Sequence, residues 1–172
     1  MFFIIFFLYI FFRIKGNDTL SEVNRKNSIG TTNWVLNIDK RLPLRLVIPE
    51  VMKMQEKKRG DSAHKNETAE NYYSYADSIG KNLAFIPFTK VYYKMEKPKN
   101  GVIVFFDKNN KILVNSKEIS KNDLENHIKN NSSNNDVFYC FDKNMNFGTY
   151  VILKIFVKSI EWEFISNHEF AY

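Results

Sequence analysis

The chain has 172 residues, of which 44% are hydrophobic and 16% aromatic, with a formal net charge of +6. The length predicts one modest folded unit, and the low content of glycine (6) and proline (4) excludes collagen-like and Gly/Pro-rich low-complexity proteins. A single cysteine, Cys140, excludes an intrachain disulfide framework and a multi-cysteine zinc site, and the three histidines do not stand at metal-ligand spacing.

The positive charge lies outside the part of the chain that reads most clearly as folded. Residues 1–100 carry 17 basic and 10 acidic side chains, a balance of +7, whereas residues 101–172 carry 8 and 9, a balance of −1. This distribution argues against a basic nucleic-acid-binding face on a folded domain and fits a tether beside an anionic membrane surface. A general bias towards Lys and Asn explains the charge distribution equally well. Because residues 101–172 carry no excess of positive charge, we expect no nucleic-acid partner.

The first twelve residues are apolar except for the hydroxyl of Tyr9, and Arg13 and Lys15 follow them. A complete bilayer crossing needs about 20 apolar residues, so this run is short. Three interpretations compete: a short or truncated membrane anchor, a secretory signal peptide without a basic start or a clear cleavage site, and a core element. We interpret residues 1–15 as a membrane anchor helix. The basic residues after it would, taken alone, favour a cytoplasmic C-terminal part.

Residues 16–100 are predicted to be a basic, partly disordered linker with short ordered islands. The segment 46–50 (LVIPE) is expected to be extended, because the ring of Pro49 restricts the backbone of Ile48. Residues 53–71 are charged and poor in apolar side chains, which indicates disorder or a solvated helix. Residues 83–93 are apolar enough to pack, and an edge strand there would tolerate Pro87.

Residues 101–172 are predicted to form a small α+β domain. Two short apolar runs, 102–106 and 111–115, flank a four-residue polar turn and indicate a β-hairpin. Ser120 and Asp123 have the spacing of a capping box before a helix that carries Leu124 and Ile128 on one face. A fully apolar strand is expected over residues 137–141.

The stretch 149–160 fits two structures equally well from its pattern. As a helix it gathers Ile152, Ile155, Phe156 and Ile160, and as a strand it alternates apolar and polar side chains. Strand propensity favours the second, whereas a crossover between strands at 137–141 and 162–165 favours the helix. The helical choice predicts the order ββαβαβ, with two helices on one face of a mixed sheet.

No set of residues in the sequence forms a recognisable catalytic or metal site. Cys140 lies inside an apolar strand and has no basic sequence neighbour, which is typical of a buried structural thiol. Glu161 and Glu163 would lie on one side of a strand as a solvated face. Asp142 and Lys143 directly follow a strand and form either a site or a polar turn whose Asp caps the next helix. We expect no enzymatic activity, metal or cofactor.

From residue 102 onward the chain resembles the periplasmic domain of the ExbD/TolR family of biopolymer-transport proteins. The resemblance rests on the strand-turn-strand VIVFFDKNNKILVN, the helix KNDLENHI, the strand DVFYCF and then DKNMNFG. Its most specific part is the spacing of Asp142, Lys143, Phe147 and Gly148 after a strand, with Phe147 where the family usually has Tyr. The resemblance implies that residues 149–160 are helical.

Membership would imply a single-span inner-membrane protein with a periplasmic C-terminal domain, which forms a homodimer inside a ring of a polytopic ExbB/TolQ-like partner. Such proteins couple proton flow to a TonB/TolA-like force-transmitting protein through an Asp in the membrane span. Residues 1–12 contain no acidic side chain. Either the true start lies upstream, or the chain is a paralogue that carries no protons.

The segment Leu46, Val47, Ile48 and Pro49 is similar to the short L-P-containing motif of the family. In an extended conformation it could pair with an exposed sheet edge. The expected function is that of a membrane-tethered component of a proton-driven energy-transducing complex that supports transport across the envelope. The alternative is a membrane-anchored or secreted periplasmic adaptor domain without proton coupling.

Overall fold

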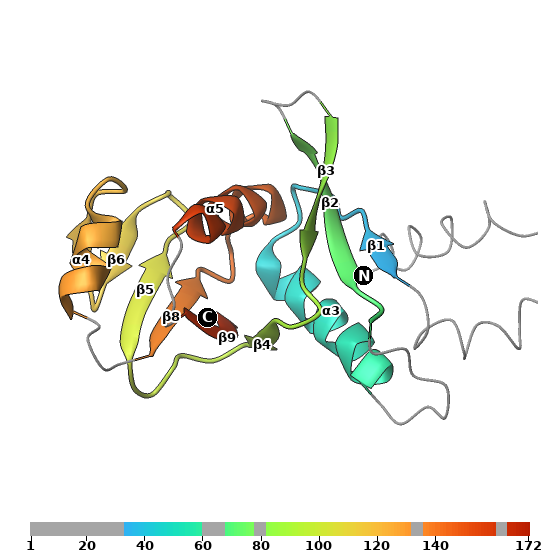
Figure 1. Cartoon of the computed structure of the whole chain (residues 1–172), viewed down its shortest axis with the longest axis horizontal. Coiled ribbons are helices and arrows are strands. Elements are labelled where there is room, and N and C mark those ends of the chain that lie inside the picture. Colours follow the sequence, from blue (N-terminus) through green and yellow to red (C-terminus); the bar gives the residue numbers. More distant parts are fainter. Residues whose placement is uncertain (1–32, 60–67, 78–81, 132–135, 161–164) are drawn as a thin grey trace, which may run out of the picture. The chain divides into compact units, whose positions relative to one another are not determined.

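The structure is a computed structural model that describes residues 33–59, 68–77, 82–131, 136–160 and 165–172 (Figure 1). The chain divides into two compact units: unit 1 comprises Met1–Ile38 and Glu50–Thr89, and unit 2 comprises Asp39–Pro49 and Lys90–Tyr172. The boundary falls within helix α3 (Leu44–Arg59). Among the described residues, no helix is both long and apolar enough to cross a bilayer. The expected anchor, residues 1–15, lies outside the described residues.

Unit 1 contains a three-stranded sheet in the order β1-β2-β3. Strand β1 (Trp34–Leu36) is parallel to β2 (Asn71–Asp77), which is antiparallel to β3 (Asn82–Pro87). The sheet buries one face, because Tyr73 and its cross-strand partner Ile86 are both almost fully covered. Phe88 follows β3 and stacks on Tyr73 with the ring centroids 4.1 Å apart, so this aromatic pair forms the centre of the unit 1 core.

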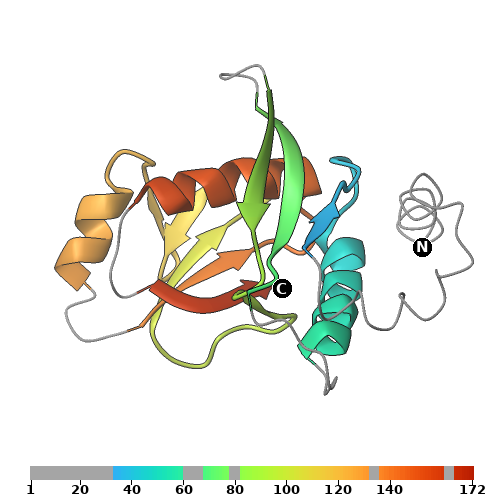
Figure 2. The ribbon, with the colours of Figure 1, turned by 45° about the vertical axis from the view of Figure 1, so that its right-hand side comes forward.

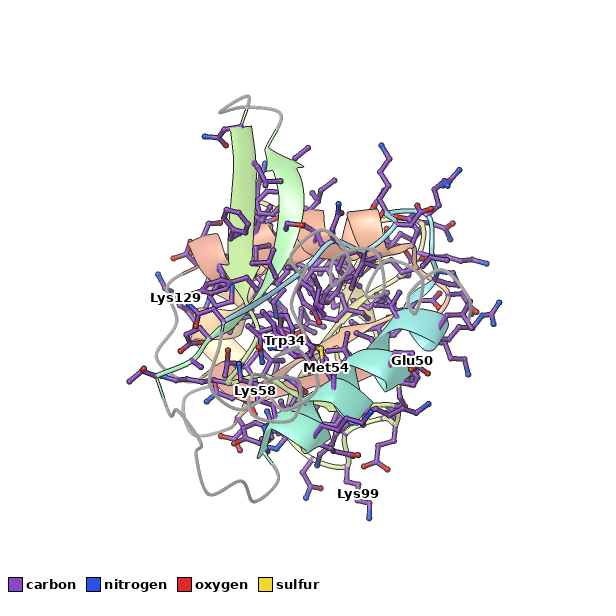
Figure 3. The ribbon with its side chains drawn as sticks, turned by 90° about the vertical axis from the view of Figure 1, so that its right-hand side faces the viewer. Trp34, Glu50, Met54, Lys58, Lys99 and Lys129 are labelled. Atoms are coloured by element: carbon purple, nitrogen blue, oxygen red, sulfur yellow. The ribbon has the colours of Figure 1, made fainter. Side chains whose placement is uncertain are left out.

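The second half of α3 is joined to this sheet by two buried polar side chains, Gln55 and Lys58. Glu50, Met54 and Lys58 mark successive turns of the helix in Figure 3. Lys58 is buried, and its ammonium donates to Oδ1 of Asn71 at 2.7 Å. Burial lowers the pKa of Lys58, and the nearby Glu70 carboxylate opposes that effect. Gln55 adds a buried bond from Nε2 to the carbonyl of Phe88 at 3.0 Å.

Unit 2 is an α+β structure built on a six-stranded mixed sheet in the order β4-β9-β8-β5-β6-β7. Strands β4, β9, β8 and β5 are mutually parallel, and β6 and β7 are antiparallel additions. The elements in chain order are β4 (Tyr92–Lys94), β5 (Val102–Phe106), β6 (Ile112–Val114), β7 (Lys117–Ile119), α4 (Leu124–Asn131), β8 (Val137–Phe141), α5 (Phe147–Ser159) and β9 (Ile165–Ala171).

The core of unit 2 lies between α5 and one face of this sheet (Figure 2). Alternate residues of β5 and β8 pair in register, so that Phe106 lies beside Phe141 with the rings stacked 5.3 Å apart. Tyr150 of α5 meets the ring of Phe141 edge to face at 4.9 Å. Aromatic side chains therefore join helix and sheet at the carboxyl ends of the central strands.

Several expected elements of unit 2 are confirmed. The hairpin is formed by β5 and β6, and β8 has the predicted bounds. Of the predicted capping box, the amide of Asp123 donates to Oγ of Ser120 at 3.2 Å, whereas the Asp123 carboxylate accepts from the Ser120 hydroxyl at 2.6 Å, and α4 begins at Leu124. Leu124 and Ile128 are both buried. The ambiguous stretch 149–160 is helical. A helix here connects the parallel neighbours β8 and β9, which a tight turn cannot join.

Other expectations differ from the structure. The last strand is β9 over Ile165–Ala171, so the predicted strand at 162–165 overlaps it only at Ile165, and Glu161 and Glu163 lie outside the described residues. Strand β7 was not expected, because its sequence KEI is short and polar. The expected edge strand near Pro87 is confirmed as β3.

The predicted linker, residues 16–100, contains a helix and four strands within its described part: β1, α3, β2, β3 and β4. Its described residues therefore form most of unit 1 and one edge of the unit 2 sheet. The prediction is a partly disordered linker with short ordered islands, and the described residues of this stretch contain more regular structure than those islands. Burial through tertiary contacts explains the difference, because neighbouring strands supply partners that no local pattern reveals.

Candidate functional site

The residues that carry the family resemblance form a tight turn at the carboxyl end of β8. The Asp142 carboxylate accepts a hydrogen bond from the amide of Asn144 at 2.8 Å, and the Asp142 carbonyl accepts from the amide of Met145 at 2.9 Å. The Asp142 amide itself donates to the carbonyl of Phe106 on β5. Asp142 therefore closes a turn and does not cap the following helix. That helix is capped by Asn146, whose Oδ1 accepts from the amide of Thr149 at 2.8 Å.

This turn holds a short segment from the start of unit 2, residues 40–45. The amides of Leu44 and Arg45 donate to the carbonyls of Met145 and Lys143 at 2.9 and 2.8 Å. In the opposite direction, the amides of residues 147 and 148 donate to the carbonyls of residues 42 and 40 at 2.8 and 2.9 Å. We call this pairing the motif junction, defined as residues 40–45 and 142–148. Its four main-chain bonds attach the beginning of α3 to the beginning of α5.

The four motif positions have structural roles in the junction. Phe147 is almost fully buried and packs against the ring of Tyr150, at 5.7 Å between centroids. At Gly148 an added Cβ would lie 2.9 Å from Cβ of Lys40 and 3.3 Å from its carbonyl oxygen. Only a residue without a side chain lets the two segments approach this closely. Lys143 contributes its backbone, because its amide donates to the carbonyl of Tyr172 while its side chain is exposed.

The second predicted motif, residues 46–49, is not extended as expected. Leu46, Val47, Ile48 and Pro49 all lie within α3. Leu44, Val47, Ile48 and Val51 have helical spacing and are all buried, so burial of this stripe outweighs the restriction that Pro49 places on Ile48. Strand pairing through these four residues is therefore wrong for the described conformation.

A buried polar cluster that the sequence analysis did not predict lies under α5 in unit 2. Tyr93 of β4 and Tyr139 of β8 are the register neighbours of Glu169 on β9, so the three side chains lie on one face of adjacent strands. Tyr150 and Lys154, one helical turn apart on α5, complete the cluster. Lys154, only 3% exposed, forms an ion pair with Oε1 of Glu169.

The hydrogen bonds of the cluster run in one direction, from the Tyr93 hydroxyl to the Tyr150 hydroxyl and from there to the Glu169 carboxylate. The Tyr150 hydroxyl donates to Oε2 of Glu169 at 2.7 Å, so in its 3.1 Å contact with Tyr93 it accepts. The Lys154 ammonium also lies 5.6 and 6.0 Å from the ring centroids of Tyr150 and Tyr93. Both charges thus have several partners, as buried charges require. The cluster fastens α5 to the β4 and β9 edge of the sheet.

Tyr139 belongs to the face of β8 that carries this cluster, and Cys140, the next residue, is a buried ionisable group on the opposite face of the sheet. The Tyr139 hydroxyl is buried and has no hydrogen-bond partner, and burial raises its pKa to about 12. Burial also raises the pKa of the Cys140 thiol to about 12, although Lys97 and the Tyr172 hydroxyl act in the opposite direction. The Cys140 thiol therefore stays protonated at neutral pH, the state in which a cysteine is a poor nucleophile.

The His, Cys, Asp and Glu side chains of the described residues are the groups that could hold a metal ion. Across residues 33–59, 68–77, 82–131, 136–160 and 165–172, no three His, Cys, Asp or Glu side chains are grouped to hold a metal ion. One sequence signal could have pointed to the buried polar cluster under α5, namely Lys154 standing alone in the otherwise apolar run YVILKIFV.

No protein-family model, no curated protein and no solved structure matches the chain.

Proposed function

We propose that the chain is a non-enzymatic, membrane-tethered component of a proton-motive-force-driven complex of the ExbB-ExbD-TonB or TolQ-TolR-TolA type, which supports transport across the envelope. The observation that carries the proposal is the place of Asp142–Gly148, directly after a central parallel strand and directly before a crossover helix. That is where the family resemblance puts its most specific motif. Apart from the additional strand β7, the order of β5, β6, α4, β8, α5 and β9 also agrees with the family pattern.

In this proposal, residues 1–15 anchor the chain as a single span in the inner membrane, and unit 2 is the ExbD/TolR-like domain in the periplasm. The partners are a second copy of the chain, a polytopic ExbB/TolQ-like protein and a TonB/TolA-like force-transmitting protein. No cofactor takes part. The domain acts by holding partners and transmitting displacement.

The motif junction supplies a physical route for that displacement. A pull on the N-terminal part of the chain would reach unit 2 at residues 40–45, where four main-chain bonds join them to the turn after β8. Each such bond contributes about 0.5–1.5 kcal/mol net to stability. The motif would thus be the attachment point of the tether, and its polar residues need no catalytic role.

Co-purification tests the proposal. The full chain, tagged at its C-terminus, is expressed in its native host, solubilised in mild detergent and isolated. We expect a polytopic ExbB/TolQ-like protein to accompany it at a fixed ratio, and deletion of residues 1–15 to abolish that association. A matched control, Ile152→Ser on the exposed side of α5, should leave the association unchanged, because that side chain is 64% exposed.

The alternative is an anchored or secreted periplasmic adaptor without proton coupling, which the absence of acidic residues in positions 1–12 favours. An adaptor would purify without any polytopic protein, with or without residues 1–15. That result would overturn the motor assignment.

A further inference from the structure

The connection between β4 and β5 carries the single Asn-Gly pair of the chain, Asn100 and Gly101. Residues 95–101, which we call the strap, run from the end of β4 to the start of β5 (Figure 1), and β9 and β8 lie between those two strands in the sheet. Gly101 lies against the ring of Phe138, whereas the next residue of β8, Tyr139, faces α5. The end of the strap therefore contacts the face of the sheet opposite α5.

The two groups that can react with each other in this pair have no hydrogen-bond partner. Asn100 and Gly101 are both exposed. Within the described part of the chain, neither the Asn100 side chain nor the Gly101 amide forms a hydrogen bond. Gly101 also has no Cβ that would block the approach of its own amide nitrogen to the Asn100 side chain. The pair is therefore open to attack of the Gly101 amide on the Asn100 carboxamide.

We propose that Asn100 converts spontaneously to isoaspartate and aspartate, and that the isoaspartate form disturbs the strap. The Gly101 amide nitrogen attacks Cγ of Asn100 and forms a carbon–nitrogen bond. The proton that it loses is balanced by one that Nδ2 gains, the bond from Cγ to Nδ2 breaks, and ammonia leaves. The cyclic imide that results then takes up water from solvent. Addition at the α-carbonyl carbon gives isoaspartate, and addition at Cγ gives aspartate. Both products ionise and lower the formal net charge from +6 to +5.

A second asparagine of unit 2 is protected by its hydrogen bond. Asn115 precedes the small residue Ser116, but its Oδ1 accepts from the amide of Ile103 at 3.0 Å. That bond holds the carboxamide against the neighbouring strand and has to break before Cγ can be attacked. Folding should therefore slow the reaction at Asn115, whereas at Asn100 no such bond has to break. The two positions form a matched pair within one chain.

The two products should differ in their effect on packing. Isoaspartate inserts a methylene group into the main chain directly before Gly101, where little space remains. A Cβ on Gly101 would already lie 2.5 Å from Cε2 of Phe138 and 2.7 Å from the carbonyl oxygen of Asp136. Inserting atoms into such a contact displaces its neighbours and is destabilising. Aspartate keeps the original main chain and avoids this effect. The inference uses the contacts of the strap alone and does not rest on the proposed function.

Timed incubation of the full chain in detergent tests the site, with one sample folded and a second unfolded in urea. Mildly alkaline buffer favours loss of the amide proton, and peptide mass spectrometry follows Asn100 and Asn115 separately. We expect Asn100 to convert in the folded chain within about tenfold of its rate in the unfolded chain. Asn115 should convert at least tenfold more slowly when folded. If Asn100 is protected by folding as strongly as Asn115, the proposal is overturned.

Two variants identify the source and the effect of the reaction. Asn100→Gln keeps the carboxamide but moves it too far for rapid ring closure, so it should gain far less of the acidic species that isoelectric focusing shows in the native chain. The same yield in Asn100→Gln would place the reaction elsewhere and overturn the proposal. Asn100→Asp reproduces the aspartate product. The isoaspartate form, isolated by chromatography, should unfold at a lower urea concentration than Asn100→Asp, and equal midpoints would overturn the disturbance of the strap.

Discussion

Lys154 on α5 and Glu169 on β9 form a buried ion pair that joins the crossover helix to the last strand of the sheet. Their side chains are 4% and 15% exposed, and both carboxylate oxygens of Glu169 are occupied, one by Lys154 and the other by Tyr150. Taking two charges out of water is expensive, and the partners recover that expense only when the geometry is complete. The pair therefore makes one arrangement of α5 on the sheet strongly preferred over others.

Removing Lys154 alone should be severely destabilising. Lys154→Met leaves the Glu169 carboxylate buried without its countercharge, and we expect a loss of about 3–5 kcal/mol in the free energy of unfolding. Urea titration followed by circular dichroism measures it. The double variant Lys154→Met/Glu169→Leu should recover much of the loss. Lys108→Met, at an exposed position in the β5–β6 turn, should change stability by less than about 0.5 kcal/mol.

Two tyrosines of the same cluster should respond oppositely to loss of the hydroxyl. Tyr139→Phe removes a buried hydroxyl without a hydrogen-bond partner and should leave stability unchanged or raise it by about 1 kcal/mol. Tyr150→Phe removes the bond to Glu169 and the acceptor for Tyr93, and should destabilise by about 1.5–3 kcal/mol. Thermal and urea unfolding compare the two. Equal losses in both variants would contradict the assignment of Tyr139 as the unpaired member.

Stability should fall at alkaline pH. The pKa values of Tyr139 and Cys140 rise to about 12 in the folded chain from 10.0 and 9.0, so both groups bind their protons more tightly when folded. Their contribution is complete below about pH 9 and is lost between pH 9 and 12, on the order of 2 kcal/mol for Tyr139. Unfolding free energies measured from pH 7 to 11 check the slope. Tyr139→Phe should show a shallower decline, and a parallel decline would contradict the role of this hydroxyl.

The glycine of the motif junction should be irreplaceable for steric reasons. Gly148→Ala brings a methyl group to within 2.9 Å of Cβ of Lys40, and we expect a loss of about 1–2 kcal/mol although alanine is the better helix former. The melting temperature and urea midpoint measure it.

A double-mutant cycle identifies the contact at Gly148. Lys40→Gly removes the opposing Cβ, so in that background Gly148→Ala should lose less stability than in the native chain. If the two substitutions are additive, the loss comes from another source. Gly101→Ala provides a scale for comparison. Gly101 has φ +95°, and a Cβ there would lie 2.5 Å from Cε2 of Phe138, so its loss should exceed that of Gly148→Ala.

The turn between β6 and β7 should accept a stabilising change. Asn115 and Ser116 have φ angles of 46° and 73°, the left-handed region required at both central positions of a tight hairpin turn. Ser116→Gly should therefore stabilise by about 0.5–1 kcal/mol. Asn115→Gly should bring no such gain, because Oδ1 of Asn115 accepts from the amide of Ile103 at 3.0 Å. Urea unfolding of both variants tests the difference, and a stability loss in Ser116→Gly would contradict it.

Local patterns predicted the elements whose partners are close in sequence. The β5–β6 hairpin and the cap of α4 follow from turn chemistry and from side chains a few residues apart, so the interactions that define them are visible in the sequence. The extended conformation predicted around Pro49 is wrong, because burial of Leu44, Val47 and Ile48 at helical spacing outweighs the local restriction that proline places on the backbone. Position 154 carried only a weak signal, a single lysine in an apolar run.

The sequence by itself determined the β5–β6 hairpin, α4 and β8, because periodicity and turn residues act over short separations. It did not reveal β4 or β7, and its pattern left residues 149–160 open between helix and strand. Tertiary structure alone decided that residues 40–45 bond to the turn after β8. It also brought together Tyr93, Tyr150, Lys154 and Glu169, and it ordered the described part of the predicted linker. The contacts at the turn and in the cluster join residues from 15 to more than 100 positions apart. Whether a lysine or a tyrosine is buried with a partner depends on which strands become neighbours, and that depends on packing of the whole sheet.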